Sequence, residues 1–318
     1  MSVATKDMGE TAGETGGGAL KGAILIAGPT ASGKSGLALR IAAATGGTIV
    51  NADSMQVYGV LRVLTARPSP EEEAQVPHVL YGHVDPATLY STGAWLRDVA
   101  GVIASARSRP LIFVGGTGLY FEALTRGLSR MPDIPQAIRD YWRQRLAAEG
   151  AQHLHKVLRE RDEAVAERLR QQDGQRIVRA LEVLEASGRS ILRWQEERGA
   201  PLVDAATAQR FVLAPPRAEL SRNIAVRLAS MLRQGALEEV HALRALDIDP
   251  QSPAMKAIGV PELGAGLDGA MSMDEAVEAT ISATRRYAKR QETWMRNRFD
   301  KGWQRFESTA PIAEKFSL

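Results

Sequence analysis

The chain contains no cysteine, and only 5% of its residues are aromatic. The absence of cysteine excludes disulfides, cysteine-ligated zinc and cysteine nucleophiles, and it fits a reducing compartment. No apolar run approaches the roughly 18–20 residues that a membrane span needs. The 318 residues, 44% of them hydrophobic, are enough for one large domain or two modest ones. We therefore expect a cytoplasmic protein that is not inserted in a membrane.

The chain also has little excess charge, with a formal net charge of only +3. Global charge is therefore weak support for binding of nucleic acid. One segment is distinctly basic, because "RRYAKRQETWMRNR" (285–298) has six basic residues and one acidic residue. This segment is either the solvated face of a helix or a surface that meets RNA.

Residues 1–20 lack an apolar core and are rich in glycine and threonine. They do not resemble a secretory signal, and Asp7, Glu10 and Glu14 argue against an organelle transit peptide. We predict that residues 1–20 form a disordered tail.

Three short apolar stretches are typical of buried parallel strands: "AILIA" (23–27), "GTIVNAD" (47–53) and "PLIFVGG" (110–116). Between the first two, Leu37, Ala38, Ile41 and Ala42 share one face of a helix, which gives a βαβ unit. "QRFVLAPP" (209–216) is a fourth candidate strand. The sequence predicts an α/β fold with a three-layer core and a parallel sheet, whose ligands gather at the carboxyl ends of the strands.

Residues 132–205 have a different character, with helical patterns laced with arginine and glutamate and no strand signal. We predict an all-helical domain inserted into a core made of residues 21–131 and 206–318. Two further helices are predicted in the second half of the core, over 221–243 and 272–298. Ser272 and Glu275 have the spacing of a capping box at the start of the second.

"GPTASGKS" (28–35) is a complete P-loop placed between a predicted strand and a predicted helix. The amides of its glycine-rich turn and the helix N-terminus favour an anion. Lys34 would add a positive charge at the terminal phosphate, and the Ser35 hydroxyl would bind the accompanying Mg²⁺. The residues predicted to hold the phosphate chain are Gly28, Thr30, Ala31, Ser32, Gly33, Lys34 and Ser35.

The P-loop is not followed by the acid that ATPases and GTPases usually have at the end of an apolar strand. "PLIFV" ends in "GGTGLY", so Gly115 stands where that acid would be. An acid stands instead at the end of another predicted strand, where Asp53 begins "DSMQVY". This pattern argues against a hydrolytic switch or motor and leaves a kinase open.

Taken together, the motifs "GPTASGKS", "NADSMQVY" and "VGGTGLY" resemble those of the tRNA dimethylallyltransferases, also called tRNA isopentenyltransferases. "LTARP" (64–68), "PHVLYGHVDP" (77–86), "QRIVRALEV" (175–183) and "ATRRYAKRQETWMR" (283–296) agree with the same family. The resemblance runs from about residue 22 to residue 300. It implies a P-loop fold of the kind seen in nucleoside triphosphatases.

The resemblance implies a reaction as well. A dimethylallyl group passes from dimethylallyl diphosphate to N6 of the adenosine immediately 3′ of the anticodon in tRNA, and diphosphate is released. The P-loop would then hold the diphosphate of an isoprenoid together with Mg²⁺, the one cofactor expected. The expected partners are the tRNA anticodon loop and dimethylallyl diphosphate, and the protein is expected to be a monomer.

The resemblance assigns catalytic roles to Asp53, Thr117 and Arg227. The adenine amine is a poor nucleophile because its lone pair is delocalised into the ring, so a carboxylate that accepts its proton would help. Asp53 matches the family's general base. The alternative interpretation of Asp53 is a structural or magnesium-associated residue. Thr117 and Arg227 would face the phosphates. Without the resemblance, Thr117 could simply cap a helix, and Arg227 could lie on the surface.

The remaining matches concern tRNA. An extruded loop base would lie against the "DSMQ" segment, where Gln56 has the donor and acceptor that suit adenine. The inserted helices would grip the anticodon stem-loop. The residues predicted to contact tRNA are Asp53, Ser54, Met55, Gln56, Thr117, Arg139, Gln175, Arg176, Arg179, Lys256, Arg286 and Lys289.

Four positions depart from the family pattern: Asn223, Val260 and Pro261 stand where members often have basic or aromatic residues, and Arg67 replaces a lysine. Arginine at a phosphate contact keeps the charge and changes the geometry. Three alternative functions stay open. They are an adenylate isopentenyltransferase that uses a free nucleotide, a P-loop nucleotide or small-molecule kinase that binds ATP, and a non-catalytic, nucleotide-gated RNA-binding protein.

Overall fold

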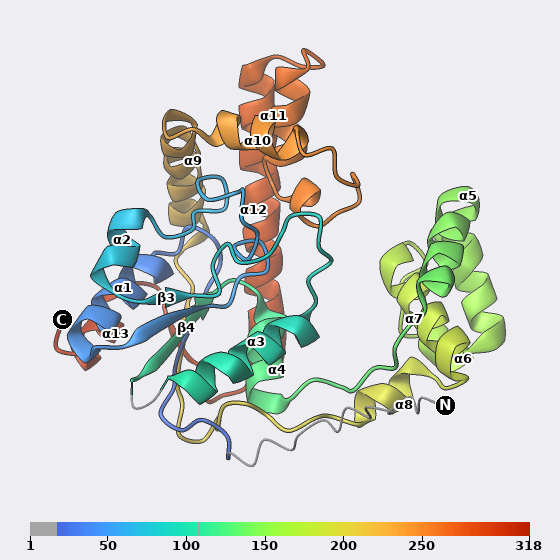
Figure 1. Cartoon of the computed structure of the whole chain (residues 1–318), viewed down its shortest axis with the longest axis horizontal. Coiled ribbons are helices and arrows are strands. Elements are labelled where there is room, and N and C mark those ends of the chain that lie inside the picture. The colour runs from blue at the N-terminus through green and yellow to red at the C-terminus, as the bar shows by residue number, and fades with distance from the viewer. Residues whose placement is uncertain (1–17, 107–108) are drawn as a thin grey trace, which may run out of the picture.

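A computed structural model describes residues 18–106 and 109–318. Among these residues, parallel strands form one sheet in the order β3-β2-β4-β1-β5-β6 (Figure 1). Neighbouring strands are therefore joined by crossovers, and all the strands end at the same edge. The strands are β1 (Ile24–Ala27), β2 (Thr48–Asn51), β3 (His78–Val79), β4 (Leu111–Gly115), β5 (Gln209–Leu213) and β6 (Gln304–Phe306).

Helices cover both faces of the sheet, and successive side chains of β1 pack alternately against one face's helices and the other's. Ile24 and Ile26 pack with α1 (Lys34–Thr45) and α13 (Ala310–Lys315). Leu25 and Ala27 pack on the other face with α3 (Thr92–Ser105) and α4 (Gly118–Arg126). The three-layer α/β core predicted from the sequence is confirmed.

Trp95 of α3 is, with Trp142, one of the two largest fully buried side chains among the described residues, and it holds the end of β2 in place. Its indole Nε1 donates a hydrogen bond to the backbone oxygen of Asn51 at 2.9 Å, and its ring stacks on Tyr120 at a centroid distance of 4.2 Å. Asn51 is the last residue of β2, two positions before Asp53. The packing of α3 therefore positions the segment that carries Asp53.

We expect Trp95→Phe to lower the free energy of unfolding by about 1–3 kcal/mol, because a buried carbonyl loses its donor. Trp95→Ala, which also leaves a cavity, should cost about 3–5 kcal/mol. Urea titration followed by circular dichroism would measure both. Wild-type stability of Trp95→Phe would show that the indole hydrogen bond contributes nothing.

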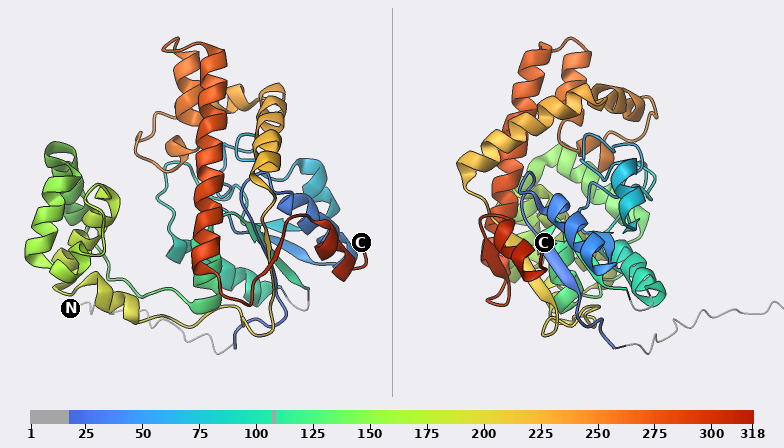
Figure 2. Two further views of the ribbon diagram at one scale, coloured as in Figure 1. Left: turned by 180° about the vertical axis from the view of Figure 1, so that it is seen from behind. Right: turned by 90° about the vertical axis from the view of Figure 1, so that its left-hand side faces the viewer.

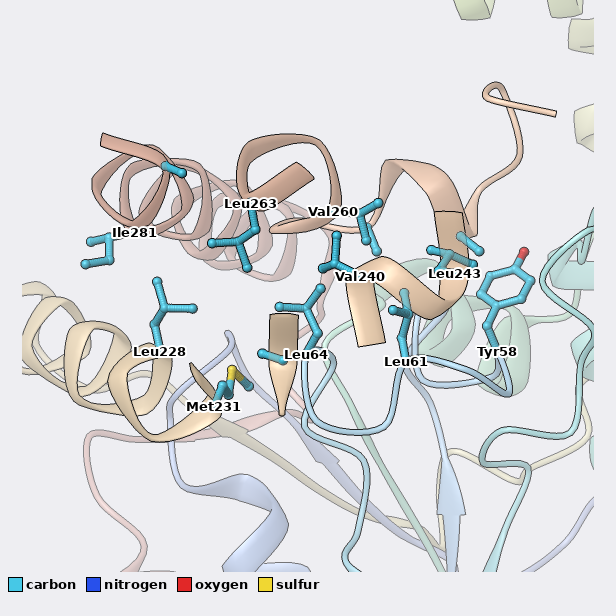
Figure 3. Close-up of a cluster of buried hydrophobic side chains, with 14 of the residues drawn as sticks. Tyr58, Leu61, Leu64, Leu228, Met231, Val240, Leu243, Val260, Leu263 and Ile281 are labelled. Atoms are coloured by element: carbon cyan, nitrogen blue, oxygen red, sulfur yellow. The ribbon is translucent and has the colours of Figure 1, made fainter. Parts of the chain in front are cut away.

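A second core lies above the sheet edge, between helices from the second half of the chain (Figure 3). It joins α9 (Arg217–Arg233), α10 (Ala236–Arg244), α11 (Val260–Leu267) and α12 (Met273–Arg298) to the segment 57–64. Glu239 of α10 anchors that segment, since its carboxylate accepts the backbone N–H groups of three consecutive residues, 62–64, at 2.7–2.9 Å. The short helix η1 (Ala254–Lys256) adds Ala254 to this core, whereas Val76, at the end of the short helix α2 (Pro70–Gln75), packs with the cluster around α1.

The inserted helices have a core of their own and stand to one side of the sheet (Figures 1 and 2). They are α5 (Gln136–Arg161), α6 (Glu163–Ala166), α7 (Gly174–Ser187) and α8 (Ile191–Glu196), packed around Trp142. The chain enters and leaves this unit at one crossing. Gly127 has φ 75°, and a Cβ there would lie 1.8 Å from the backbone oxygen of Gly199.

The predicted strands are present at 24–27, 48–51, 111–115 and 209–213, and the helix over 272–298 begins with the Ser272 capping box. The predicted helix over 221–243 is wrong in one respect. Gly235, at φ 100°, separates it into α9 and α10. Within the described ranges, no helix is both long and apolar enough to cross a membrane.

Two edge strands, β3 and β6, were not predicted, because they have only two and three residues and lack a buried apolar run. Most of the predicted tail, residues 1–17, lies outside the described residues. Leu20, the last residue of that stretch, forms a β-bridge with Val203.

Candidate active site

The P-loop follows β1 directly and leads into α1. Gly33 takes the left-handed conformation at the N-cap of α1, with φ 84°, and Ala31 also has a positive φ of 64°. Gly28 is needed where the loop leaves the sheet, since a Cβ there would lie 2.9 Å from the backbone oxygen of Leu213. Because Gly33 has no capping side chain, the first amides of α1 are left for an external anion.

Two P-loop side chains have environments that suit a phosphate. Burial lowers the pKa of Lys34 from 10.5 to about 8, the Asp53 carboxylate opposes this shift, and Arg227 adds to it. Lys34 Nζ donates to the backbone oxygen of Pro29 at 3.3 Å. The Ser32 hydroxyl is buried and has no hydrogen-bond partner among the described residues. A bound anion would give the Ser32 hydroxyl a partner and Lys34 an opposite charge.

Diphosphate affinity should fall as the pH rises through about 8, because Lys34 then loses the charge that attracts the anion. Calorimetric titration with inorganic diphosphate from about pH 7 to pH 9.5 would measure this. Lys34→Arg is the control, since arginine stays charged across this range. Titration of the ligand itself affects both proteins equally. A slope identical in the wild type and Lys34→Arg would contradict the assignment.

Asp53 lies just beyond β2 in a loop fixed by hydrogen bonds on both sides. Asn51 accepts the Asp53 N–H through Oδ1 at 2.8 Å and donates to the Asp53 backbone oxygen through Nδ2 at 2.9 Å. Asp53 Oδ1 accepts the N–H of Met55 at 2.9 Å. The backbone therefore holds one carboxylate oxygen, and Oδ2 has no such bond to the described backbone.

Thr117 occupies the N-cap position of α4 without capping it. Its hydroxyl oxygen instead accepts the N–H of Ser54 at 2.9 Å and donates to Ser54 Oγ at 3.3 Å. The interpretation as a simple helix cap is thus wrong. Thr117 joins the end of β4 to the loop that carries Asp53.

Arg227 reaches the P-loop from α9. Its Nη1 donates to the Thr30 hydroxyl at 3.1 Å. Burial lowers the pKa of Arg227 and the Asp53 carboxylate opposes this shift, so the half-buried guanidinium faces an acid. The interpretation of Arg227 as a surface residue is wrong.

Two cavities meet at the P-loop, and we name each after one lining residue. The Asp53 cavity has a volume of about 300 Å³ and apolar walls from Leu64, Ile224, Leu228 and Ile258. The Lys34 cavity has a volume of about 660 Å³ and contains the polar turn of the P-loop. Both are lined by Ala31, Arg227 and Met231. A molecule with a charged head and a short apolar tail could occupy both at once.

The structure brings one group of predicted residues to these cavities. The Asp53 cavity is lined by Thr30, Ala31, Asp53, Ser54, Met55, Arg227 and Lys256. The Lys34 cavity is lined by Ala31, Ser32, Gly33, Lys34, Ser35 and Arg227. Gln56 lines neither cavity, and its Nε2 donates to the backbone oxygens of Thr65 and Ala66 at 2.9 and 2.8 Å, so both donors predicted to face adenine are engaged.

A second group of predicted residues does not line these cavities. Four lie on the inserted helices, namely Arg139 on α5 and Gln175, Arg176 and Arg179 on α7. Arg179 forms an ion pair with Glu182 at 3.4 Å, and Arg176 pairs with Asp173 at 3.3 Å. Arg286 and Lys289 are exposed on α12.

The four positions that depart from the family pattern lie in different environments in the structure. Asn223 donates to the backbone oxygen of Ala31 at 3.3 Å, so it supports the P-loop. Val260 is 2% exposed and belongs to the core of Figure 3, with Pro261 beside it in the first turn of α11. Arg67 donates to the backbone of Tyr58 and Gly59, and it also lines the Lys34 cavity.

Sequence reasoning missed two side chains of α12 at this site. Tyr287 lines the Asp53 cavity, where burial, with a smaller effect of Asp53, raises the pKa of its phenol. Gln291 is bonded to both the P-loop and the residue after β4. The helical spacing of these two residues, four positions apart, was the only signal available.

The fold and the P-loop place the chain among the P-loop α/β proteins, with an acid at the end of β2 in place of one at the end of β4. The model of the family described as IPP transferase matches residues 56–298. The chain belongs to this family of enzymes.

Curated relatives agree with this assignment. A protein of Mesorhizobium japonicum named tRNA dimethylallyltransferase is 58% identical over 94% of this chain and 93% of its own. One of Chelativorans sp. with the same name is 59% identical over 90% of this chain and 98% of its own.

Solved structures agree as well. The full-length tRNA isopentenylpyrophosphate transferase from Bacillus halodurans has a TM-score of 0.65 and 27% identity, covering 94% of this chain and 97% of its own. A eukaryotic dimethylallyltransferase described as acting on tRNA has a TM-score of 0.74 and 25% identity, covering 87% of this chain and 70% of its own.

Proposed function

We propose that this protein transfers a dimethylallyl group from dimethylallyl diphosphate to N6 of the adenosine immediately 3′ of the anticodon in tRNA. The observation that carries the proposal is the pair of cavities that share lining residues, one with a carboxylate and apolar walls and one with a P-loop. The names of the family's curated members, at 58–59% identity, support the same activity. The protein is proposed to work in the cytoplasm, as a monomer.

The diphosphate would occupy the Lys34 cavity, and the dimethylallyl chain would extend along the apolar wall of the Asp53 cavity. Lys34, Arg227 and the free amides of α1 would meet the charge that grows on the leaving diphosphate. Ser35, in the first turn of α1, lines the Lys34 cavity and fits a Mg²⁺ that is held mainly by phosphate oxygens and water. Such an ion would add positive charge at the diphosphate.

The acceptor adenine would enter the Asp53 cavity with its N6 amine at the carboxylate. The bond between the allylic carbon and the diphosphate oxygen breaks, and its electron pair leaves with the diphosphate. The N6 lone pair forms the new carbon–nitrogen bond, and one N6 proton passes to Asp53 Oδ2, the oxygen that the backbone leaves free. Thr117 would hold the Asp53 loop during this step through Ser54.

The inserted helices would supply the contacts to the anticodon stem-loop. Their basic residues Arg139, Arg176 and Arg179 line neither cavity and lie on α5 and α7, which stand to one side of the sheet (Figure 1). A free nucleotide is too small to use such a unit, which favours tRNA over AMP as the acceptor. The exposed Arg286 and Lys289 of α12 would face the RNA backbone between the two parts.

The test is one assay with purified protein, Mg²⁺, radiolabelled dimethylallyl diphosphate and unmodified tRNA. Parallel reactions contain AMP in place of tRNA, or ATP in place of the isoprenoid. Label in tRNA alone is the expected result. Label in AMP would identify an adenylate isopentenyltransferase, and ATP consumption without labelling would identify a kinase. RNA binding without either would leave a non-catalytic binder.

A further inference from the structure

Gln291 lies within α12 and is only 5% exposed. Its Oε1 accepts the backbone N–H of Thr30 at 2.9 Å, and its Nε2 donates to the backbone oxygen of Gly116 at 3.1 Å. Thr30 belongs to the loop after β1 and Gly116 to the loop after β4, and these strands are neighbours in the sheet. One side chain of α12 therefore joins the two loops.

Gly116 lies between Gln291 and the carboxylate. A Cβ at this position would be 2.0 Å from Gln291 Nε2 and 3.3 Å from Asp53 Oδ2. Only glycine leaves room for both side chains. The Gln291 amide and Asp53 Oδ2, the oxygen proposed to react, therefore both lie beside the backbone of Gly116.

Further hydrogen bonds extend this link in both directions. On one side, the Thr30 hydroxyl accepts from Arg227 Nη1 at 3.1 Å. On the other, Thr117 follows Gly116 and accepts the N–H of Ser54. Gln291 thus connects the P-loop, where Thr30 is bonded to Arg227, with the segment Gly116–Thr117 that holds the Asp53 loop.

We propose that Gln291 is a positioning residue, which sets the P-loop at a fixed distance from Asp53. The inference rests on the proposed transfer reaction. The side-chain oxygen and nitrogen of Gln291 bond to the backbone of Thr30 and Gly116. Gln291 would therefore act through these two residues and not on the substrate. In-line transfer needs donor and acceptor held in register, and a misplacement of about 1 Å can lower the rate about 10²-fold.

Two substitutions separate hydrogen bonding from bulk. Gln291→Met keeps the length of the side chain and removes both hydrogen bonds. We expect kcat to fall about 10–100-fold, with little change in KM for tRNA. Gln291→Glu keeps the shape and, at neutral pH, loses the donor to Gly116.

The second substitution also provides a pH signature. A protonated carboxyl can donate to Gly116 and accept from Thr30, as the amide does. Burial and the nearby Asp53 would raise the pKa of the introduced carboxyl, while Lys34, Arg227 and a hydrogen bond from the Tyr287 phenol would oppose that shift. The ratio of kcat for Gln291→Glu to wild-type kcat should therefore rise as the pH falls from about 8 to 6. The same ratio for Gln291→Met should stay flat, since titration of Asp53 cancels in both.

Met295→Ala is the matched control, because Met295 lies one turn further along α12, is 1% exposed and makes no hydrogen bond to either loop in the part of the chain that the structure describes. It should lower the Tm and leave kcat at the wild-type value. Wild-type kcat in Gln291→Met, equal loss in Met295→Ala, or pH-independent ratios for both Gln291 variants would overturn the inference.

Binding of inorganic diphosphate gives a readout independent of prenyl transfer. It should be weaker in Gln291→Met than in the wild type and unchanged in Met295→Ala. Failure of the proposed function would show as no transfer by the wild type, and this binding comparison would still decide the role of Gln291. Equal diphosphate affinity in Gln291→Met and the wild type would count against the link.

Discussion

Replacing Asp53 by asparagine should lower kcat for prenyl transfer by about 10²–10⁴-fold, the usual contribution of a general base. The amide keeps the shape of the side chain and an oxygen that can accept the Met55 N–H, now 2.9 Å from Asp53 Oδ1. It can no longer take a proton from the adenine amine. The loss should therefore fall on kcat, while tRNA affinity measured by filter binding stays within a few-fold of the wild type.

Asp85→Asn is the matched control for this substitution. Asp85 makes the same kind of turn, since its Oδ1 accepts the N–H of Ala87 at 2.8 Å, and it is exposed away from both cavities. We expect wild-type kcat from it. Substantial prenyl transfer by Asp53→Asn would remove Asp53 from the role of base and would favour a structural role.

Lys34→Met should lower kcat by about 10²–10³-fold, as does the loss of one donor to a developing negative charge. The same substitution is not expected to lower the thermal stability of the protein. Burial lowers the pKa of Lys34 to about 8, which means that the folded protein disfavours its charge. An uncharged side chain of similar length should leave the Tm unchanged or raise it.

Lys21→Met is the control, because Lys21 is exposed before the other end of β1. It should change neither kcat nor diphosphate binding. A lower Tm together with lower activity in Lys34→Met would point to misfolding as the cause. Wild-type kcat in a folded Lys34→Met protein would exclude the P-loop lysine from leaving-group stabilisation.

The sequence predicted the core of the fold because buried parallel strands leave a strong local signal. β1, β2 and β4 are short, mostly apolar runs that end at or just before a glycine or aspartate, and the P-loop between β1 and α1 is a contiguous motif. Edge strands carry no such signal. β3 pairs through two half-buried residues, and its existence depends on β2 lying alongside.

The site was predictable to the extent that its residues are contiguous in motifs. Asp53, Thr117 and the P-loop lie at strand ends, where parallel topology must bring them together. Arg227 and Gln291 come from helices far along the chain, and helical periodicity does not reveal which neighbour a polar side chain meets. The long-range hydrogen bonds of Gln291 became visible only in three dimensions.

The crossing of Gly127 and Gly199 has a consequence for how the chain folds. The chain leaves for the inserted helices and returns at one point, where the N–H of Gly199 donates to the backbone oxygen of Leu128 at 2.9 Å. If α5–α8 fold first, they already bring these two glycines together, and the core then closes across a short effective loop. Because closure entropy grows only logarithmically, with about 0.6 kcal/mol for each doubling of loop length, a unit attached at one crossing adds little to the entropic barrier for assembling the sheet.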